Sequence, residues 1–157
     1  MHKISPCLWF DGKAEAATNF YAGIFKNARI GNVMRYGDAG PLPKGSVMSV
    51  EFALDGQDFI ALNGPPIFTF SPAISLFVKC ETQDEVDDYW AKLSAGGKTL
   101  QCGWLTDKFG VTWQIVPTIL HALLQDKDAA KSQRVIEAMM KMVKLDIAGL
   151  KQAYEQG

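Results

Sequence analysis

The chain has 157 residues, of which 48% are hydrophobic and 21% are charged, and its formal net charge is −1. This length and composition are typical of one globular domain, or two fused half-domains, with a sizeable core. The charge balance excludes a strongly basic surface for nucleic acid or an anionic membrane, and no apolar run is long enough to span a bilayer.

Cysteine usage and the N-terminal residues indicate the compartment. Cys7, Cys80 and Cys102 are odd in number and show no CxxC spacing, which is typical of reduced thiols. The first residues also lack the charged-then-apolar pattern of a signal peptide. We therefore expect a cytoplasmic protein with neither a nucleic-acid nor a membrane partner.

The first half of the chain predicts the order β-α-β-β-β. Apolar residues at helical spacing predict a helix over 13–25, with Asp11 as its cap. Glycine and proline mark 37–45 as a loop, and the pair Asp55-Gly56 predicts a tight hairpin turn. The strands are expected at residues 4–10, 28–36, 46–54 and 57–63.

The second half repeats this order. A strand is expected at 73–80, and a helix that begins at 82 or 83 is expected to end near 95, where Gly96 and Gly97 follow. A short strand over 98–101 leads into a final hairpin. An internal repeat indicates two similar modules, and helices on one side of each sheet leave the other face free to curl around a cavity.

The hairpin at 101–117 is the most informative stretch. Asp107 to Gly110 supply the turn, where Asp107 and Lys108 are expected to be solvated. The following strand alternates, so that Thr112 and Gln114 share one face. Trp113 lies on the other face and is assigned to the core. Pro117 ends the strand because it has no N–H to donate.

The last forty residues predict a helical tail over 118–157. Helices are expected at 118–125 and 129–144, and Asp146 is expected to cap a third helix. The middle helix has a broad apolar face made by Val135, Ile136, Met139, Met140 and Val143. This face either packs against the body or a second subunit, or forms a lid over the pocket.

The repeated module order resembles the vicinal oxygen chelate superfamily, the group of glyoxalase I, extradiol dioxygenases and bleomycin-resistance proteins. More closely, the chain resembles the PhnB-like family, whose members are often labelled 3-demethylubiquinone-9 3-methyltransferases. The matching residues are 8–12, 20–21, 61–65, 90, 102–105, 107–111, 113–117 and 140–142.

The resemblance implies an α+β fold and a homodimer. Paired modules at about 1–66 and 67–117 are expected to form one domain, which the helical tail follows.

The resemblance also gives a test for a metal. Superfamily enzymes hold a divalent ion with four side chains, one from each of four strands, drawn from His, Glu and sometimes Gln, and use it as a Lewis acid. Here the corresponding positions fall near 4–6, where Ser5 is the strongest donor, near 60–61, near 73–75 and at Gln114. Such an ion needs several anionic or imidazole donors. We therefore expect no metal and no other cofactor.

Strand alternation and the resemblance together nominate residues that line a pocket. Each has an alternative role as a satisfied structural amide or a core side chain. The pocket candidates are Trp9, Asn63, Ser75, Phe77, Trp104, Thr112 and Gln114.

Two functions of different class follow. The first is a metal-independent small-molecule binding protein of the bleomycin-resistance type, which holds an aromatic or amphipathic ligand. The second is an enzyme of lyase, dioxygenase or transferase type that acts on a small carbonyl or phenolic compound through residues such as Gln114 and Asn63. The methyltransferase label has no support from motifs, because the Gly-rich segment 37–45 joins two strands rather than a strand and a helix.

Overall fold

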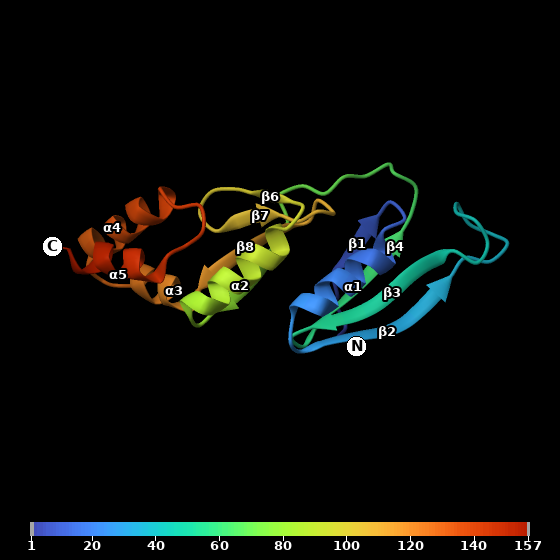
Figure 1. The fold of residues 1–157 in the computed structure, drawn as a ribbon, viewed down its shortest axis with the longest axis horizontal. Helices are drawn as coiled ribbons and strands as arrows, with labels where there is room; N and C mark the ends of the chain where they lie inside the picture. The colour runs from blue at the N-terminus through green and yellow to red at the C-terminus, as the bar shows by residue number, and fades with distance from the viewer. Residues whose placement is uncertain (1, 157) are drawn as a thin grey trace. The chain divides into compact units, whose positions relative to one another are not determined.

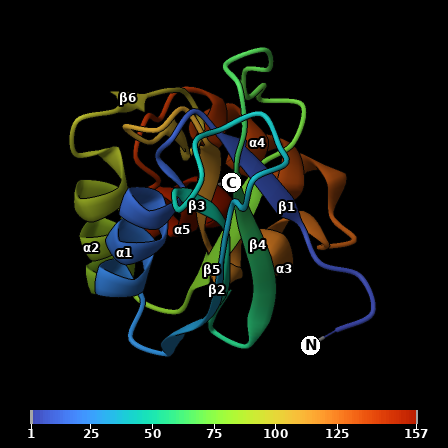
Figure 2. The ribbon, with the colours of Figure 1, turned by 90° about the vertical axis from the view of Figure 1, so that its right-hand side faces the viewer.

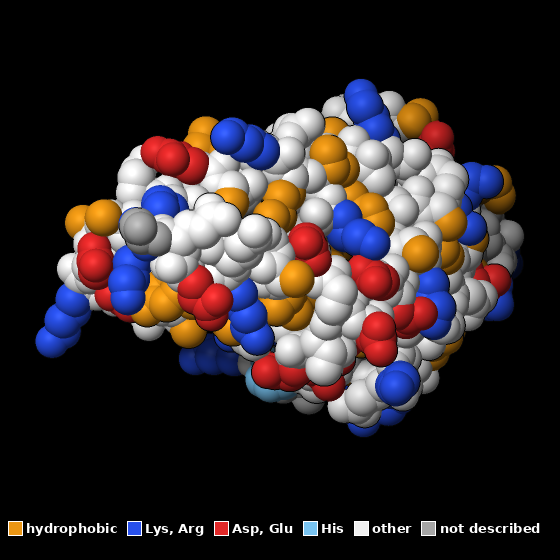
Figure 3. All heavy atoms as spheres, turned by 60° about the vertical axis from the view of Figure 1, so that its left-hand side comes forward, with side chains coloured by type: hydrophobic (Ala, Val, Ile, Leu, Met, Phe, Trp, Pro, Cys, Tyr) orange, Lys and Arg blue, Asp and Glu red, His pale blue; other side chains and the backbone are white. Residues whose placement is uncertain are grey.

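The computed structural model describes residues 2–156, which form two compact units. Unit 1 ends at Thr69 and unit 2 begins at Phe70 (Figure 1). Within this described part of the chain, no helix combines the length and the apolar character needed to cross a membrane. On the face drawn in Figure 3, acidic and basic side chains are interspersed, in keeping with the net charge of −1.

Unit 1 is a four-stranded mixed sheet covered on one face by a helix. Its elements are β1 (Cys7–Phe10), α1 (Ala14–Ile24), β2 (Ala28–Arg35), β3 (Val47–Leu54) and β4 (Gln57–Asn63). The strand order is β1-β4-β3-β2, with β1 parallel to β4 and the other pairs antiparallel. The helix α1 lies along the sheet (Figure 2). The predicted order β-α-β-β-β is therefore confirmed for this half.

An aromatic stack fills the space between α1 and the sheet of unit 1. Tyr21 of α1 stacks on Phe52 of β3 at 6.2 Å between ring centroids, and Phe52 stacks on Phe59 of β4 at 5.1 Å. All three rings are buried. Asp55 and Gly56, with φ of 48° and 82°, form the predicted turn between β3 and β4, because both central residues of such a turn need positive φ.

The start of α1 differs from the prediction that Asp11 caps it. The N-cap position is Lys13, whose side chain makes no capping hydrogen bond. Instead, the Asn63 Oδ1 atom accepts from the backbone N–H of Ala14 at 2.8 Å. A residue 49 positions away therefore satisfies one of the free N–H groups that every helix start leaves.

Unit 2 repeats the architecture and adds three helices. Its elements are β5 (Leu76–Cys80), α2 (Gln83–Ser94), β6 (Lys98–Thr99), β7 (Trp104–Thr106), β8 (Thr112–Pro117), α3 (Thr118–Leu124), α4 (Ala129–Met140) and α5 (Ile147–Glu155). The strand order is β5-β8-β7-β6, with β5 parallel to β8. Thr82 caps α2 by accepting from the N–H of Glu85. The chain is thus an α+β protein with two βαβββ-like sheets and C-terminal helices, as predicted.

The turn between β7 and β8 corrects one sequence interpretation. Asp107 was expected to be solvated, yet it is only 3% exposed. Its Oδ1 atom accepts from the N–H groups of Phe109 (2.8 Å) and Val111 (3.1 Å), and its Oδ2 accepts from Trp113 Nε1 at 2.9 Å. The buried indole and the turn backbone need an acceptor, and Asp107 supplies it.

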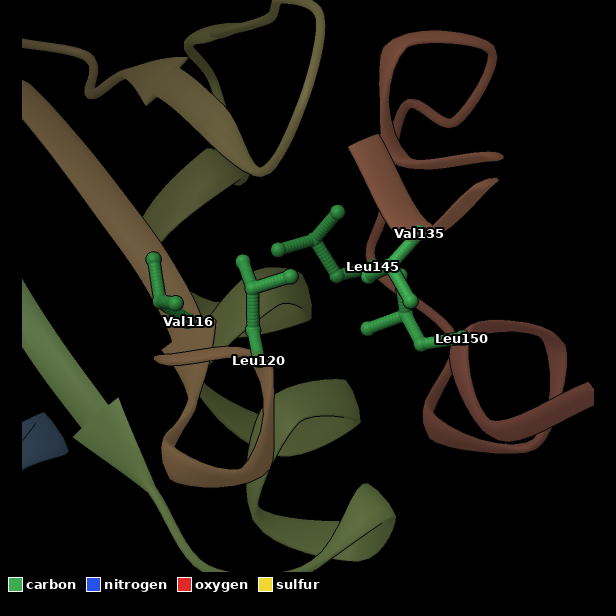
Figure 4. Close-up of a cluster of buried hydrophobic side chains, with 5 residues drawn as sticks. All are labelled: Val116, Leu120, Val135, Leu145 and Leu150. Carbon is green, nitrogen blue, oxygen red and sulfur yellow. The ribbon is translucent and has the colours of Figure 1, made fainter. Parts of the chain in front are cut away.

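The C-terminal helices pack against the sheet of unit 2 rather than standing apart from it. Five buried side chains point toward one another in a shared core (Figure 4), and they are Val116, Leu120, Val135, Leu145 and Leu150. Of the predicted apolar face, Val135 and Met139 pack in this core, whereas Met140 and Val143 are 62% and 41% exposed. The middle helix ends at Met140, earlier than the predicted 144, and Asp146 caps α5 as expected.

Candidate functional site

The sheet of unit 2 has one face that α2 covers and an opposite face that is only partly exposed, since Thr112 and Val116 on that face are buried. On β8, Trp113 and Ile115 are buried on the face that α2 covers. Thr112 and Gln114 alternate with them, so they lie on the opposite face, which we call the open face of unit 2. The strand alternation predicted this arrangement, and the register of the sheet agrees with it.

Three of the nominated residues form a row across the open face. Phe77 on β5 lies directly opposite Gln114 on β8, and Gln114 lies opposite Trp104 on β7. Phe77 is 54% exposed, while Gln114 and Trp104 are partly buried. The row therefore places an amide between two aromatic side chains on one accessible surface.

Two further nominated residues lie beside this row. Ser75, just before β5, accepts a hydrogen bond on Oγ from Gln114 Nε2 at 2.9 Å. Thr112 is 1% exposed, and its Oγ1 atom has no hydrogen-bond partner among the described residues. A buried hydroxyl usually has a partner, often an ordered water, and at this exposure Thr112 is not accessible to a ligand on the surface of the sheet.

Trp9 belongs to unit 1 and has a different environment. On β1, Leu8 and Phe10 are buried, and Trp9 alternates with them, which places it on the face that α1 leaves open. Its Nε1 donates to the carbonyl of Pro65 at 3.0 Å, and its ring packs edge-on to Phe68 at 5.1 Å. The indole N–H is therefore already used by the chain itself.

Asn63 lies on the covered face of unit 1, opposite Phe10. Besides accepting from Ala14, its side chain donates from Nδ2 to the carbonyl of Val47 at 3.0 Å, and its own carbonyl accepts from Tyr36 Oη at 2.6 Å. These contacts join α1 to the end of β4. Because the amide is occupied on both sides, we leave Asn63 out of the proposed site.

The positions that hold a metal in the superfamily carry weak donors here. They fall near residues 4–6, 60–61 and 73–75 and at Gln114, where serine hydroxyls and one neutral amide are the strongest donors. Across residues 2–156, no group of three or more His, Cys, Asp or Glu side chains is placed to hold a metal ion. This donor set does not fit a divalent ion, which requires several charged or imidazole ligands. The metal-free site stays a prediction, and the donor chemistry supports it.

The contact between His2 and Asp58 in unit 1 was not predicted from the sequence. His2 donates its backbone N–H to Asp58 Oδ2 at 2.8 Å, and its Nδ1 lies 2.7 Å from the same oxygen. These hydrogen bonds hold the pKa of Asp58 below its usual range. The two residues are 56 positions apart and share no motif, so no local signal could have paired them.

Comparison with known proteins shows the family to which the chain belongs. The family model described as 3-demethylubiquinone-9 3-methyltransferase matches residues 2–116. A PhnB protein from Bacillus cereus that bears the same methyltransferase name is 40% identical, with a TM-score of 0.69, over 74% of this chain and 100% of its own. The comparison with curated proteins found no match.

Two more distant structures show the fold alone. The protein PA1353 from Pseudomonas aeruginosa is 20% identical, with a TM-score of 0.60, over 74% of this chain and 96% of its own. The fosfomycin resistance protein FosX from Listeria monocytogenes is 17% identical, with a TM-score of 0.55, over 78% of this chain and 96% of its own. The matched family model and the 40% identity show that the chain belongs to the PhnB-like, 3-demethylubiquinone-9 3-methyltransferase family, with a glyoxalase-like vicinal oxygen chelate fold.

Proposed function

We propose that the chain is a metal-independent binding protein for a small aromatic or amphipathic molecule, which it holds on the open face of unit 2. The observation that carries this proposal is the row of Phe77, Gln114 and Trp104 across three neighbouring strands. Aromatic side chains contribute large apolar contact surfaces, and an amide between them can fix the orientation of a ligand through hydrogen bonds.

The spacing of the strands suits a flat guest. Neighbouring strands lie about 4.8 Å apart, so the backbones under Phe77 and Trp104 are separated by roughly 10 Å. A planar group that contacts a ring on each side needs about 3.5 Å per contact, or roughly 7 Å in all. A single aromatic ring standing over Gln114 therefore fits this interval.

The polar groups define what the ligand must offer. Ser75 fixes one end of the Gln114 amide, which leaves the other end to meet a ligand. A serine hydroxyl both donates and accepts, so the pair can present either the amide oxygen or the amide N–H groups. We therefore expect ligands with a hydrogen-bonding group attached to the ring.

The test is a saturation-transfer NMR screen of aromatic carboxylates, amides and phenols against the full chain. For each compound that binds, Phe77→Ser should weaken affinity by up to about tenfold, since an aromatic contact contributes roughly 0.5–1.5 kcal/mol beyond its area. Phe68→Ser is the matched control, because Phe68 is similarly exposed at 63% but belongs to unit 1. Binding that is insensitive to Phe77→Ser, or equally sensitive to both substitutions, would refute the site.

Elemental analysis and thermal-shift titrations with Ni²⁺, Zn²⁺, Mn²⁺ and Fe²⁺ test the metal-independent part of the proposal. We expect no stoichiometric metal and no saturable shift, because the donors at the superfamily positions are neutral. A bound metal, or a shift that a chelator reverses, would instead favour an enzyme acting on a small carbonyl or phenolic compound. Gln114→Glu provides a further check, since a degenerate metal site would regain ion affinity when its missing carboxylate is restored.

We also propose a homodimer, as the family resemblance implies. Both β1 and β5 are edge strands of their sheets, and edge strands present unpaired backbone groups that favour pairing with another chain. Light scattering on the purified chain tests this, and a monomer at micromolar concentration would refute it.

A further inference from the structure

The C-terminal segment lies beyond the part of the chain that the family model matches. The family model ends at Val116, and the Bacillus cereus protein is wholly covered by 74% of this chain. We propose that residues 142–145, between α4 and α5, act as a clamp that positions Trp104 of the candidate site. The effect on ligand binding rests on the proposed function, whereas the positioning of Trp104 can be tested without a ligand.

The clamp holds the turn that precedes Trp104 through the backbone. Cys102 donates its N–H to the carbonyl of Met142 at 2.9 Å, and Gly103 donates to the carbonyl of Val143 at 2.8 Å. Cys102 has a φ of 59°, in the left-handed region that costs a non-glycine residue roughly 1–2 kcal/mol. Contacts from outside the turn are therefore needed to hold it in this conformation.

A close packing contact reinforces these hydrogen bonds. Gly103 has a φ of 83°, and a Cβ atom added to it would lie 3.0 Å from the Leu145 side chain. Leu145 is itself fully buried. The carbonyl of Gly103 in turn accepts from the N–H of Ile115 on β8 at 2.8 Å. Gly103 is thus held between Leu145 and β8, and Trp104 is the next residue.

The clamp is fixed from its other side by α2. The Gln83 side chain donates from Nε2 to the carbonyl of Leu145 at 3.1 Å and accepts on Oε1 from the N–H of Ile147 at 2.8 Å. Lys144 Nζ lies 2.8 Å from Asp87 Oδ1. One amide therefore satisfies a donor and an acceptor of the same backbone segment, which fixes the position of Leu145 relative to α2.

The hydrophobic core of the C-terminal helices completes the link to the site. Val116 belongs to this core and lies on the same strand face as Gln114, two residues away (Figure 4). The helices are consequently joined to the open face at Val116 and to the turn before Trp104. A disturbance of Leu145 should reach Trp104, while an equal loss of volume elsewhere in the same core should not.

The test uses 5-fluorotryptophan in the full chain, with the four ¹⁹F resonances assigned by Trp→Phe substitutions. Leu145→Ala should shift and broaden the Trp104 resonance. Leu150→Ala is the matched control, because Leu150 is a fully buried leucine of the same core, whereas the side chain nearest to a Cβ added at Gly103 is that of Leu145. Leu145→Met, which conserves volume, should restore the wild-type resonance.

Two outcomes would overturn the proposal: an unchanged Trp104 resonance in Leu145→Ala, or the same change in Leu150→Ala. If Leu145→Ala fails to fold, Gln83→Ala takes its place, since it removes from outside the core the hydrogen bonds to Leu145 in the clamp and to Ile147 just after it. A shift at Trp104 then supports the clamp, and an unchanged resonance overturns it. Failure to find any aromatic ligand would refute the proposed function. The response of the Trp104 resonance would still test whether residues 142–145 position Trp104, because that measurement needs no ligand.

Discussion

The hydrogen bond between Asp107 and Trp113 should hold the final hairpin together, and Asp107→Asn tests its strength. The substitution is nearly isosteric. The new Oδ1 can still accept from the N–H groups of Phe109 and Val111, but an NH₂ group replaces the oxygen that lies 2.9 Å from Trp113 Nε1. Two donors then face each other at a site where Asp107 and Trp113 are 3% and 2% exposed.

The expected loss follows from this one contact. A hydrogen bond to a charged group contributes about 1.5–3 kcal/mol, and two donors that face each other in a buried site add a desolvation cost of about 1–3 kcal/mol. We expect Asp107→Asn to lower the free energy of unfolding by about 3 kcal/mol. For a chain of this size, that corresponds to a decrease in Tm of roughly 6–12 °C.

A double-mutant cycle with Trp113→Phe isolates the interaction. Phenylalanine removes the indole N–H, so Asp107→Asn should cost clearly less in that background. The free energies of the wild type, both single variants and the double variant are measured by urea denaturation. A coupling energy of about 1.5–3 kcal/mol is expected. Additive effects, within about 0.5 kcal/mol, would show that the contact does not stabilise the hairpin.

Two further predictions concern unit 1. Gly64→Ala should lower stability by about 1–3 kcal/mol, because the added Cβ would lie 2.2 Å from Trp9 Cζ2. Gly23→Ala, with nothing within 4 Å of its added Cβ, should instead raise the free energy of unfolding by up to about 1 kcal/mol. If urea denaturation shows that both substitutions lower the free energy of unfolding by the same amount, this reasoning is wrong. His2→Ala keeps the backbone N–H that contributes most to the lowered pKa of Asp58 but removes the side-chain hydrogen bond, so it should raise that pKa part of the way toward its usual value. The stability advantage of the wild type is then present above about pH 4 and disappears as the pH falls through the folded-state pKa of Asp58, so a constant difference in urea midpoints between pH 6 and pH 2.5 would refute this.

Short-range signals in the sequence predicted much of the fold. The Asp55-Gly56 pair predicted a tight turn, and both residues have the positive φ that it requires. The alternation on β8 predicted that Trp113 is in the core and that Gln114 lies on the opposite face. These features depend on residues within a few positions of one another. Turn conformation and strand alternation follow from such residues wherever one face of a strand is buried.

The roles of the polar residues were harder to predict, because their partners are distant in the chain. Asp107 was interpreted as solvated because turn residues usually are, yet the burial of Trp113 brings an indole N–H to it. Asp11 was expected to cap α1, but the side chain of Asn63, 49 residues beyond Ala14, accepts the hydrogen bond from the N–H at the start of this helix. Such pairings depend on which strands are neighbours, and composition does not encode that.

By itself, the sequence determined the order of the elements, the repeat of two βαβββ modules and the face on which Thr112 and Gln114 lie, since each follows from local periodicity and turn chemistry. The tertiary structure alone decided that Phe77, Gln114 and Trp104 stand in one row and that residues 142–145 hold the turn before Trp104. Strand register and the docking of α4 and α5 set these contacts. Both depend on burial and hydrogen bonding between residues tens of positions apart, which no local pattern specifies.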